Sequence, residues 1–183
     1  QRPAELIVIG NSLTRHLPSA ELAWPHSWGR AASSEGRDFA HLSGAALGLP
    51  VRVHNLPNFE SDPAANTNRI AEATGDIDTT SLVVVELGDN TRAETLAQYV
   101  LAYDKLLGAV DKARLVCVST WWNNGPLDKQ MKALCERHGG RYVYIGDIHN
   151  DPANPDKRTG RQFDVAGVND HPPRASRPQE LAT

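Results

Sequence analysis

Three polar clusters stand directly after apolar runs of the sequence, and a fourth follows the last run after a long loop. They cover residues 10–14, 88–91, 121–124 and 169–172. In an open parallel α/β sheet, ligands bind beyond the carboxyl ends of the strands, where such clusters lie. Ser12 is in the first cluster and His171 in the last. A histidine that removes the proton of a serine hydroxyl makes it a nucleophile, so these two residues are the first candidates for chemistry.

Strands are needed to position these clusters, and the sequence contains five apolar runs. The runs are Leu6–Gly10, Val51–Leu56, Leu82–Leu87, Leu115–Thr120 and Tyr142–Ile148. Most are continuous or nearly continuous rather than strictly alternating. This is typical of parallel strands that are buried on both faces.

Helical patterns lie between the apolar runs. They cover Ser34–Leu47, Ala93–Val110 and Leu127–His138. In each of them apolar residues recur every three or four positions. Asp62 followed by Pro63 is typical of a helix N-cap and a first-turn proline. The alternation predicts a three-layer α/β/α sandwich with a five-stranded parallel sheet, flavodoxin-like, formed by one domain over residues 1–183.

Three of the polar clusters resemble sequence blocks of the SGNH/GDSL hydrolases, a family of serine esterases and lipases. GNSLT at 10–14 is similar to the first block, usually written GDS, and GDN at 88–90 to the third block, G-x-N. NDHP at 169–172 is similar to the last block, in which a proline follows the histidine. WGRAAS at 28–33 also resembles a W-G-x-A-A-S stretch of one subgroup. The blocks occur in the family's order, and the resemblance spans nearly the whole chain.

The resemblance implies a catalytic role for three residues. Ser12 would be the nucleophile, and its backbone N–H would stabilise the oxyanion together with the side-chain amide of Asn90. His171 would take the serine proton and return it to the leaving alcohol. The implied activity is the hydrolysis of a small acyl ester through an acyl-enzyme, without a cofactor.

Three further residues are expected to contact the substrate. Asn11 precedes the serine, and Trp121 and Trp122 follow the fourth strand. Two consecutive tryptophans at a strand end cannot both face the same way, so at least one should line the cleft. Because aromatic rings stack on sugars, this pair favours a carbohydrate O-acetyl group as the substrate.

The second block departs from the family pattern. The family offers a glycine N–H after the second strand, whereas residues 55–60 (NLPNFE) contain no glycine. The backbone N–H of Asn58 or Phe59 is expected to substitute for it. Glu60 is expected either to cap a helix or to support this block.

The carboxylate partner of the histidine also departs from the pattern. The family places an aspartate three residues before the histidine, and Val168 stands at that position. Asp170 and Asp164 are close in sequence, and either is a candidate partner of His171. The alternative is a Ser-His dyad in which a main-chain carbonyl orients the imidazole.

Each candidate also has a structural interpretation. Ser12 and Asn11 are common helix caps, Asn90 is a common turn residue, and His171 fits an ordinary surface loop. Glu86, inside an apolar strand, is a buried acid that needs a partner. Two other functions stay open: a catalytically silent binding module on the same fold, and a flavodoxin-like binder of phosphate or flavin that uses the N–H groups of the first cluster.

The bulk composition argues against several classes of partner. The net charge of −3 over 183 residues gives no electrostatic reason to bind nucleic acid or anionic lipid. No apolar run approaches the roughly 20 residues that span a bilayer. Cys117 and Cys135 fit no metal or redox motif and are expected to be two buried small side chains; no metal is expected. No signal peptide is visible, and the compartment stays open between cytoplasmic and, if a leader was removed, secreted or periplasmic.

Overall fold

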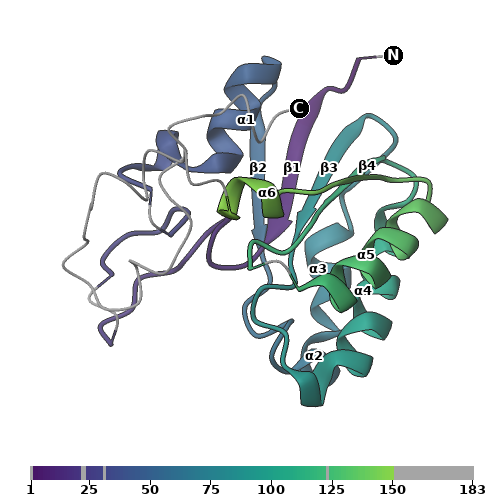
Figure 1. Ribbon diagram of the computed structural model, residues 1–183. Coiled ribbons are helices and arrows are strands. Elements are labelled where there is room, and N and C mark those ends of the chain that lie inside the picture. The colour runs from purple at the N-terminus through teal and green to yellow at the C-terminus, as the bar shows by residue number, and fades with distance from the viewer. Residues whose placement is uncertain (1, 22–23, 31, 123, 151–183) are drawn as a thin grey trace.

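A five-stranded sheet with the strand order β2-β1-β3-β4-β5 forms the centre of the protein (Figure 1). The computed structural model describes residues 2–21, 24–30, 32–122 and 124–150. The strands are β1 (Glu5–Gly10), β2 (Val51–Asn55), β3 (Ser81–Glu86), β4 (Arg114–Val118) and β5 (Arg141–Val143). Every pair of neighbours is parallel. The predicted α/β fold and five-stranded parallel sheet are therefore confirmed.

Helices cover both faces of this sheet. They are η1 (Glu35–Arg37), α1 (Phe39–Leu47), α2 (Pro63–Asn66), α3 (Arg69–Thr74), η2 (Ala93–Thr95), α4 (Leu96–Val110), α5 (Gly125–Arg137) and α6 (Gly146–Asn150). One face of the sheet presents Ile7, Ile9, Val83 and Val85, and the other presents Leu6, Val8 and Val84. The first set packs with buried residues of α3, α4 and α5, and the second with α1, which lies beside β2 in Figure 1. This alternation produces the three layers.

Polar side chains determine where two of the helices begin. Asp38 accepts a hydrogen bond from the backbone N–H of His41 at 2.9 Å, so α1 begins after it. The single helix predicted over Ser34–Leu47 is therefore divided into η1 and α1. Asp62 accepts from the N–H of Ala65, which confirms the predicted N-cap of α2.

The fifth strand is shorter than the sequence predicts. The apolar run Tyr142–Ile148 indicated one strand, but β5 ends at Val143 and α6 begins at Gly146. Ile145 and Ile148 are three positions apart, and the N–H of Ile148 donates to the carbonyl of Ile145. Both side chains pack with Val118 through this turn. A short apolar run fits a strand or a helix equally well, which is why periodicity misplaced this boundary.

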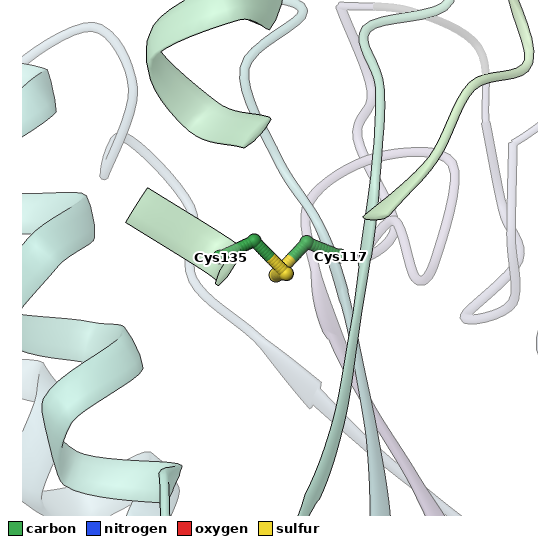
Figure 2. Close-up of a disulfide and its surroundings, with 2 residues drawn as sticks. All are labelled: Cys117 and Cys135. Atoms are coloured by element: carbon green, nitrogen blue, oxygen red, sulfur yellow. A yellow bond between two sulfur atoms is a disulfide. The ribbon is translucent and has the colours of Figure 1, made fainter. Parts of the chain in front are cut away.

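A disulfide joins the sheet to the layer of α4 and α5. Cys117 in β4 and Cys135 in α5 are both fully buried, and a bond connects their sulfur atoms (Figure 2). Both side chains lie in the core, as the sequence predicts, but they are bonded to each other rather than separate. Spacing in the sequence carries no information on this pairing, because the two elements meet only through tertiary packing.

Several sequence predictions concern residues outside the described ranges. The cluster at 169–172, with His171, Asp170 and the more distant Asp164, is among them, and so is the prediction that 1–183 is one domain. Among the described helices, none is long and apolar enough to cross a membrane.

We expect reduction of the Cys117–Cys135 bond to destabilise the protein by about 3 kcal/mol. The two cysteines are separated by 18 residues, and cross-linking a loop of this size restricts the unfolded chain by roughly that amount. Urea unfolding with and without a thiol reductant measures the difference. The C117A/C135A variant is the control and should not respond to the reductant. Identical midpoints for oxidised and reduced wild-type protein would contradict this expectation.

Candidate active site

The loops that follow β1, β2 and β3 meet at the carboxyl edge of the sheet. These strands are neighbours, because β1 lies between β2 and β3. The three loops carry Asn11 and Ser12, residues 58–60, and residues 88–90 respectively. The strand order therefore brings together the first, second and third sequence blocks.

Glu60 is the residue that joins the three loops. Its carboxylate is almost completely buried, with 1% of the residue exposed. Oε2 accepts from Nδ2 of Asn11 at 2.5 Å and from Nδ2 of Asn90 at 2.8 Å. Oε1 accepts from the N–H of Gly88 at 2.5 Å and of Asn90 at 3.3 Å. These four donors satisfy a buried charge whose burial would otherwise be costly.

Ser12 lies in the turn directly after β1. The N–H groups of Thr14 and Arg15 donate to the carbonyl of Asn11, and no described helix begins in this turn. Helix capping therefore does not explain why Ser12 and Asn11 stand here. The carbonyl of Ser12 accepts from the N–H of Arg30 at 2.8 Å. Within the described part of the chain, the Ser12 hydroxyl has no hydrogen-bond partner, so it is available to a base or a ligand.

Asn90 is exposed, and its side chain is held by Glu60. A side-chain amide has two N–H groups, so one hydrogen bond to Glu60 leaves the other available for a ligand. The turn before it depends on Gly88, whose φ is +128°. A Cβ at Gly88 would lie 3.0 Å from Cγ2 of Thr120, so both backbone conformation and space favour glycine.

The second block is organised differently from the sequence prediction. The Phe59 side chain is fully buried in edge contact with Tyr99, and the Phe59 N–H donates to the carbonyl of Leu56 at 3.3 Å. Asn58 is exposed and has a φ of +62°. Of the two proposed donors, the Asn58 N–H is therefore the one without a competing bond among the residues that the structure describes. Glu60 supports the block through its side chain, one of the two roles expected for it.

Glu86 lies at the end of β3, buried directly beneath this site. Its predicted need for a partner is met by the hydroxyl of Thr14, which donates to Oε2 at 3.1 Å. Burial raises the pKa of Glu86 well above its usual range, and the charges of Asp89 and Glu60 add to the rise. A Cβ at Gly10 would overlap the Thr14 hydroxyl, so this glycine is required for the contact.

Asp89 connects the β3 loop to the β4 loop. Its Oδ1 accepts from the N–H of Trp121 at 2.7 Å and of Trp122 at 3.4 Å. Burial raises the pKa of Asp89 to about 6, and the negative charge of Glu60 contributes to the increase. The site thus contains three neighbouring carboxyl groups, on Glu60, Glu86 and Asp89, of which two have a pKa above its usual range.

The two tryptophans face different environments, as consecutive residues at a strand end should. Trp121 is 5% exposed and packs with Val118 and Ile145. Trp122 is 43% exposed. The ring of Trp121 therefore belongs to the core, and Trp122 is the one of the pair that presents its ring to solvent. In the described part of the chain, no group of three or more His, Cys, Asp or Glu side chains is placed to hold a metal ion.

Comparison with known proteins supports the fold rather than a family. No protein-family model matches the chain, and no curated protein sequence matches it. A solved structure of a carbohydrate esterase is similar over 100% of this chain, with a TM-score of 0.55 and 16% identity. Its active site is described as displaying divergent catalytic and non-catalytic binding functions. This chain spans 63% of that protein's length, and at this identity the likeness establishes the α/β fold alone.

We expect Asp89→Asn to stabilise the protein at neutral pH and not at pH 4. A carboxyl with a raised pKa in the folded state favours folding only while protonated, so its contribution falls as the pH rises from about 4 through 6. At pH 7 the ionised Asp89 carboxylate should therefore lower the free energy of unfolding by about 2–3 kcal/mol. Urea unfolding of both proteins across this pH range measures it.

The matched control for this change is Asp78→Asn. Asp78 is exposed, and hydrogen bonds from Thr80 hold the pKa of its carboxyl below the usual value, so its removal should give no gain at neutral pH. A stability difference between Asp89→Asn and wild type that does not change with pH would contradict the assignment of the raised pKa to Asp89.

Proposed function

We propose that this protein is a serine esterase of the SGNH/GDSL type that hydrolyses a small acyl ester. The observation that carries the proposal is the Glu60 carboxylate, which holds the loop of Ser12 and the side chain of Asn90 in one site. A serine hydroxyl with no hydrogen-bond partner among the described residues and an amide with one spare N–H fit the nucleophile and an oxyanion donor of acyl transfer, to which a base must be added.

In the proposed first step, Oγ of Ser12 attacks the acyl carbon of the ester while His171 takes the hydroxyl proton. The carbonyl oxygen becomes an oxyanion, which accepts hydrogen bonds from the backbone N–H of Ser12 and from Nδ2 of Asn90. The N–H of Asn58 is the proposed third donor. The tetrahedral intermediate collapses, the bond to the alcohol oxygen breaks, and the alcohol leaves with the proton that His171 held.

In the second step, water attacks the acyl-enzyme. His171 takes one proton from the water and returns it to Oγ of Ser12, so that the carboxylic acid leaves and the serine is restored. Asp170 or Asp164 is proposed to orient the imidazole. The alternative is a dyad in which a main-chain carbonyl does so.

The proposed substrate is a carbohydrate O-acetyl ester. Trp122 presents an exposed ring beside the site, and aromatic rings stack on the apolar faces of sugars. The structurally similar protein is itself a carbohydrate esterase. Asn11 is proposed to contact the substrate through the part of its amide that Glu60 leaves available.

A non-catalytic binding module is the second candidate. The structurally similar protein combines catalytic and non-catalytic binding functions, and this chain departs from the family pattern at its second block and at the partner of the histidine. A binding module would bind a carbohydrate without forming a covalent intermediate, which the following measurement distinguishes.

We expect a fluorophosphonate to label Ser12 and no other serine. An activated hydroxyl beside oxyanion donors reacts with this probe, and mass spectrometry of the peptides locates the adduct. Ser12→Ala and His171→Ala should lose both the label and the turnover of p-nitrophenyl acetate, with folding checked by circular dichroism. Ser33→Ala, at an exposed serine, is the control and should retain both. Labelling of another residue, or wild-type turnover by Ser12→Ala, would refute the proposal.

We expect Asn90→Ala to lower kcat by about 10²–10³ with little change in KM. The amide is proposed to donate mainly in the transition state, and removing such a donor has this effect. An unchanged kcat with a raised KM would instead make Asn90 a substrate-positioning residue.

The same measurement tests Glu60 as a positioning residue. Glu60→Gln replaces one accepting oxygen by a donor and should lower kcat by about tenfold. Glu60 is proposed to act partly through Asn90. The fold loss of kcat in the double variant Glu60→Gln/Asn90→Ala should therefore be smaller than the product of the fold losses in the two single variants. Glu72→Gln, at an exposed glutamate of α3, is the control. Fully multiplicative losses would show that Glu60 does not act through Asn90.

A further inference from the structure

Arg30 is a cation beside the turn of the proposed nucleophile, and it has no anionic partner in the described part of the chain. Its backbone N–H donates to the carbonyl of Ser12 at 2.8 Å. Its Nε atom is buried and makes no hydrogen bond, and no acidic side chain of the described residues forms an ion pair with it. Burial lowers the pKa of Arg30, but a guanidinium stays protonated at neutral pH. Arg30 is half-buried, and because partial burial of an unpaired charge is unfavourable, an anion that pairs with the guanidinium would be favoured.

The segment that carries Arg30 is held firmly against the nucleophile turn. The N–H of His16 donates to the carbonyl of Trp28 at 3.0 Å, and Nε of Arg15 donates to the carbonyl of Ser27 at 3.2 Å. A Cβ at Gly29 would overlap the carbonyl oxygen of Leu13, so the two backbones touch there. These contacts fix the backbone of Arg30 relative to the turn of Ser12.

The same segment carries a stacked pair of aromatic rings. The rings of His26 and Trp28 lie 4.0 Å apart with an angle of 18° between their planes, and Trp24 meets His26 edge-on at 5.0 Å. His26 and Trp28 are half-buried, whereas Trp24 is buried behind them. Partly exposed aromatic rings are a surface on which sugar rings stack. A cation and an aromatic surface on one short loop match a ring that carries a negative charge.

We propose that residues 24–30 bind the alcohol part of the substrate and that this part is a sugar acid, whose carboxylate pairs with the guanidinium of Arg30. The proposal rests on the esterase activity proposed above. A planar guanidinium binds a carboxylate through two parallel N–H···O bonds, which fixes the orientation of the sugar as well as holding it. The ester to be cleaved would then be an acetyl group on a uronic acid.

The test compares two acetylated sugars that differ only in charge. The substrates are an O-acetylated methyl glucuronoside and the methyl glucoside acetylated at the same position. Wild-type protein should favour the glucuronoside in kcat/KM by about tenfold to a hundredfold, the usual effect of a hydrogen bond to a charged group. Arg30→Gln should lose this preference through a larger fall in kcat/KM on the glucuronoside than on the neutral sugar. Arg37→Gln removes an exposed arginine of η1 and should keep the preference.

Three results with the two sugars would overturn the inference. They are equal kcat/KM values for the two sugars with wild-type protein, an equal loss on both sugars in Arg30→Gln, and a loss of the preference in Arg37→Gln. A preference for 4-nitrophenyl hydrogen succinate over 4-nitrophenyl acetate that depends on Arg30 would place the anion on the acyl part and would also overturn it.

A binding measurement separates this inference from the esterase proposal. Titration of the Ser12→Ala variant with methyl glucuronoside and methyl glucoside, followed by calorimetry, needs no turnover. The subsite is supported if Ser12→Ala binds the glucuronoside but not the glucoside and if Ser12→Ala/Arg30→Gln binds neither. This holds even if fluorophosphonate labelling fails. Equal or absent binding of the two sugars, with Ser12-dependent hydrolysis intact, refutes the subsite and leaves the esterase proposal standing.

Discussion

The carboxylate of Glu60 accepts hydrogen bonds from Asn11, Gly88 and Asn90. Through these bonds one buried charge in the loop after β2 holds the loops that follow β1 and β3. Each loop follows a different strand, so none of these contacts exists until β2, β1 and β3 are paired in that order. The geometry of the site is therefore a property of the assembled sheet. It also has an electrostatic cost, because the charge of Glu60 contributes to the raised pKa of Asp89 and of Glu86.

Hydrogen bonds to α5 support the loop that follows β4. Asp128 in α5 accepts from the N–H of Thr120 at 2.7 Å and from its hydroxyl at 2.9 Å, and the hydroxyl of Tyr142 donates to it at 3.1 Å. Thr120 directly precedes Trp121, whose N–H is held by Asp89. Asp128 and Asp89 therefore hold the backbone at two consecutive residues, Thr120 and Trp121. Asp128 and Asp89 thus determine where the exposed Trp122 stands.

Much of the fold and part of the site could be predicted from the sequence. Continuous apolar runs locate the strands, and the rule that ligands bind at the carboxyl ends of parallel strands predicts that Asn11, Ser12 and Asn90 lie in one region. These are local signals. Asp62 and Pro63 marked the start of α2 for the same reason, since the N-cap hydrogen bond spans only three residues.

What sequence reasoning missed depends on contacts between distant elements. Glu60 contacts Gly88 across 28 positions, and nothing in its own neighbourhood indicates that partner. The sequence predicts that Phe59 is a backbone donor, but the residues around it do not show that its ring packs on Tyr99. The boundary of β5 was missed for a different reason, since a short apolar run has no periodicity that distinguishes a strand from one helical turn.

The disulfide between β4 and α5 has a consequence for how the molecule opens. Both cysteines are fully buried, so a reductant in solution reaches the sulfur atoms only when α5 separates from the sheet. At reductant concentrations where reduction is faster than reclosing, the rate of reduction under native conditions therefore measures how often that separation occurs. α5 also carries Asp128, which supports the loop of Trp122. The same rate therefore also measures how often the β4 side of the site opens.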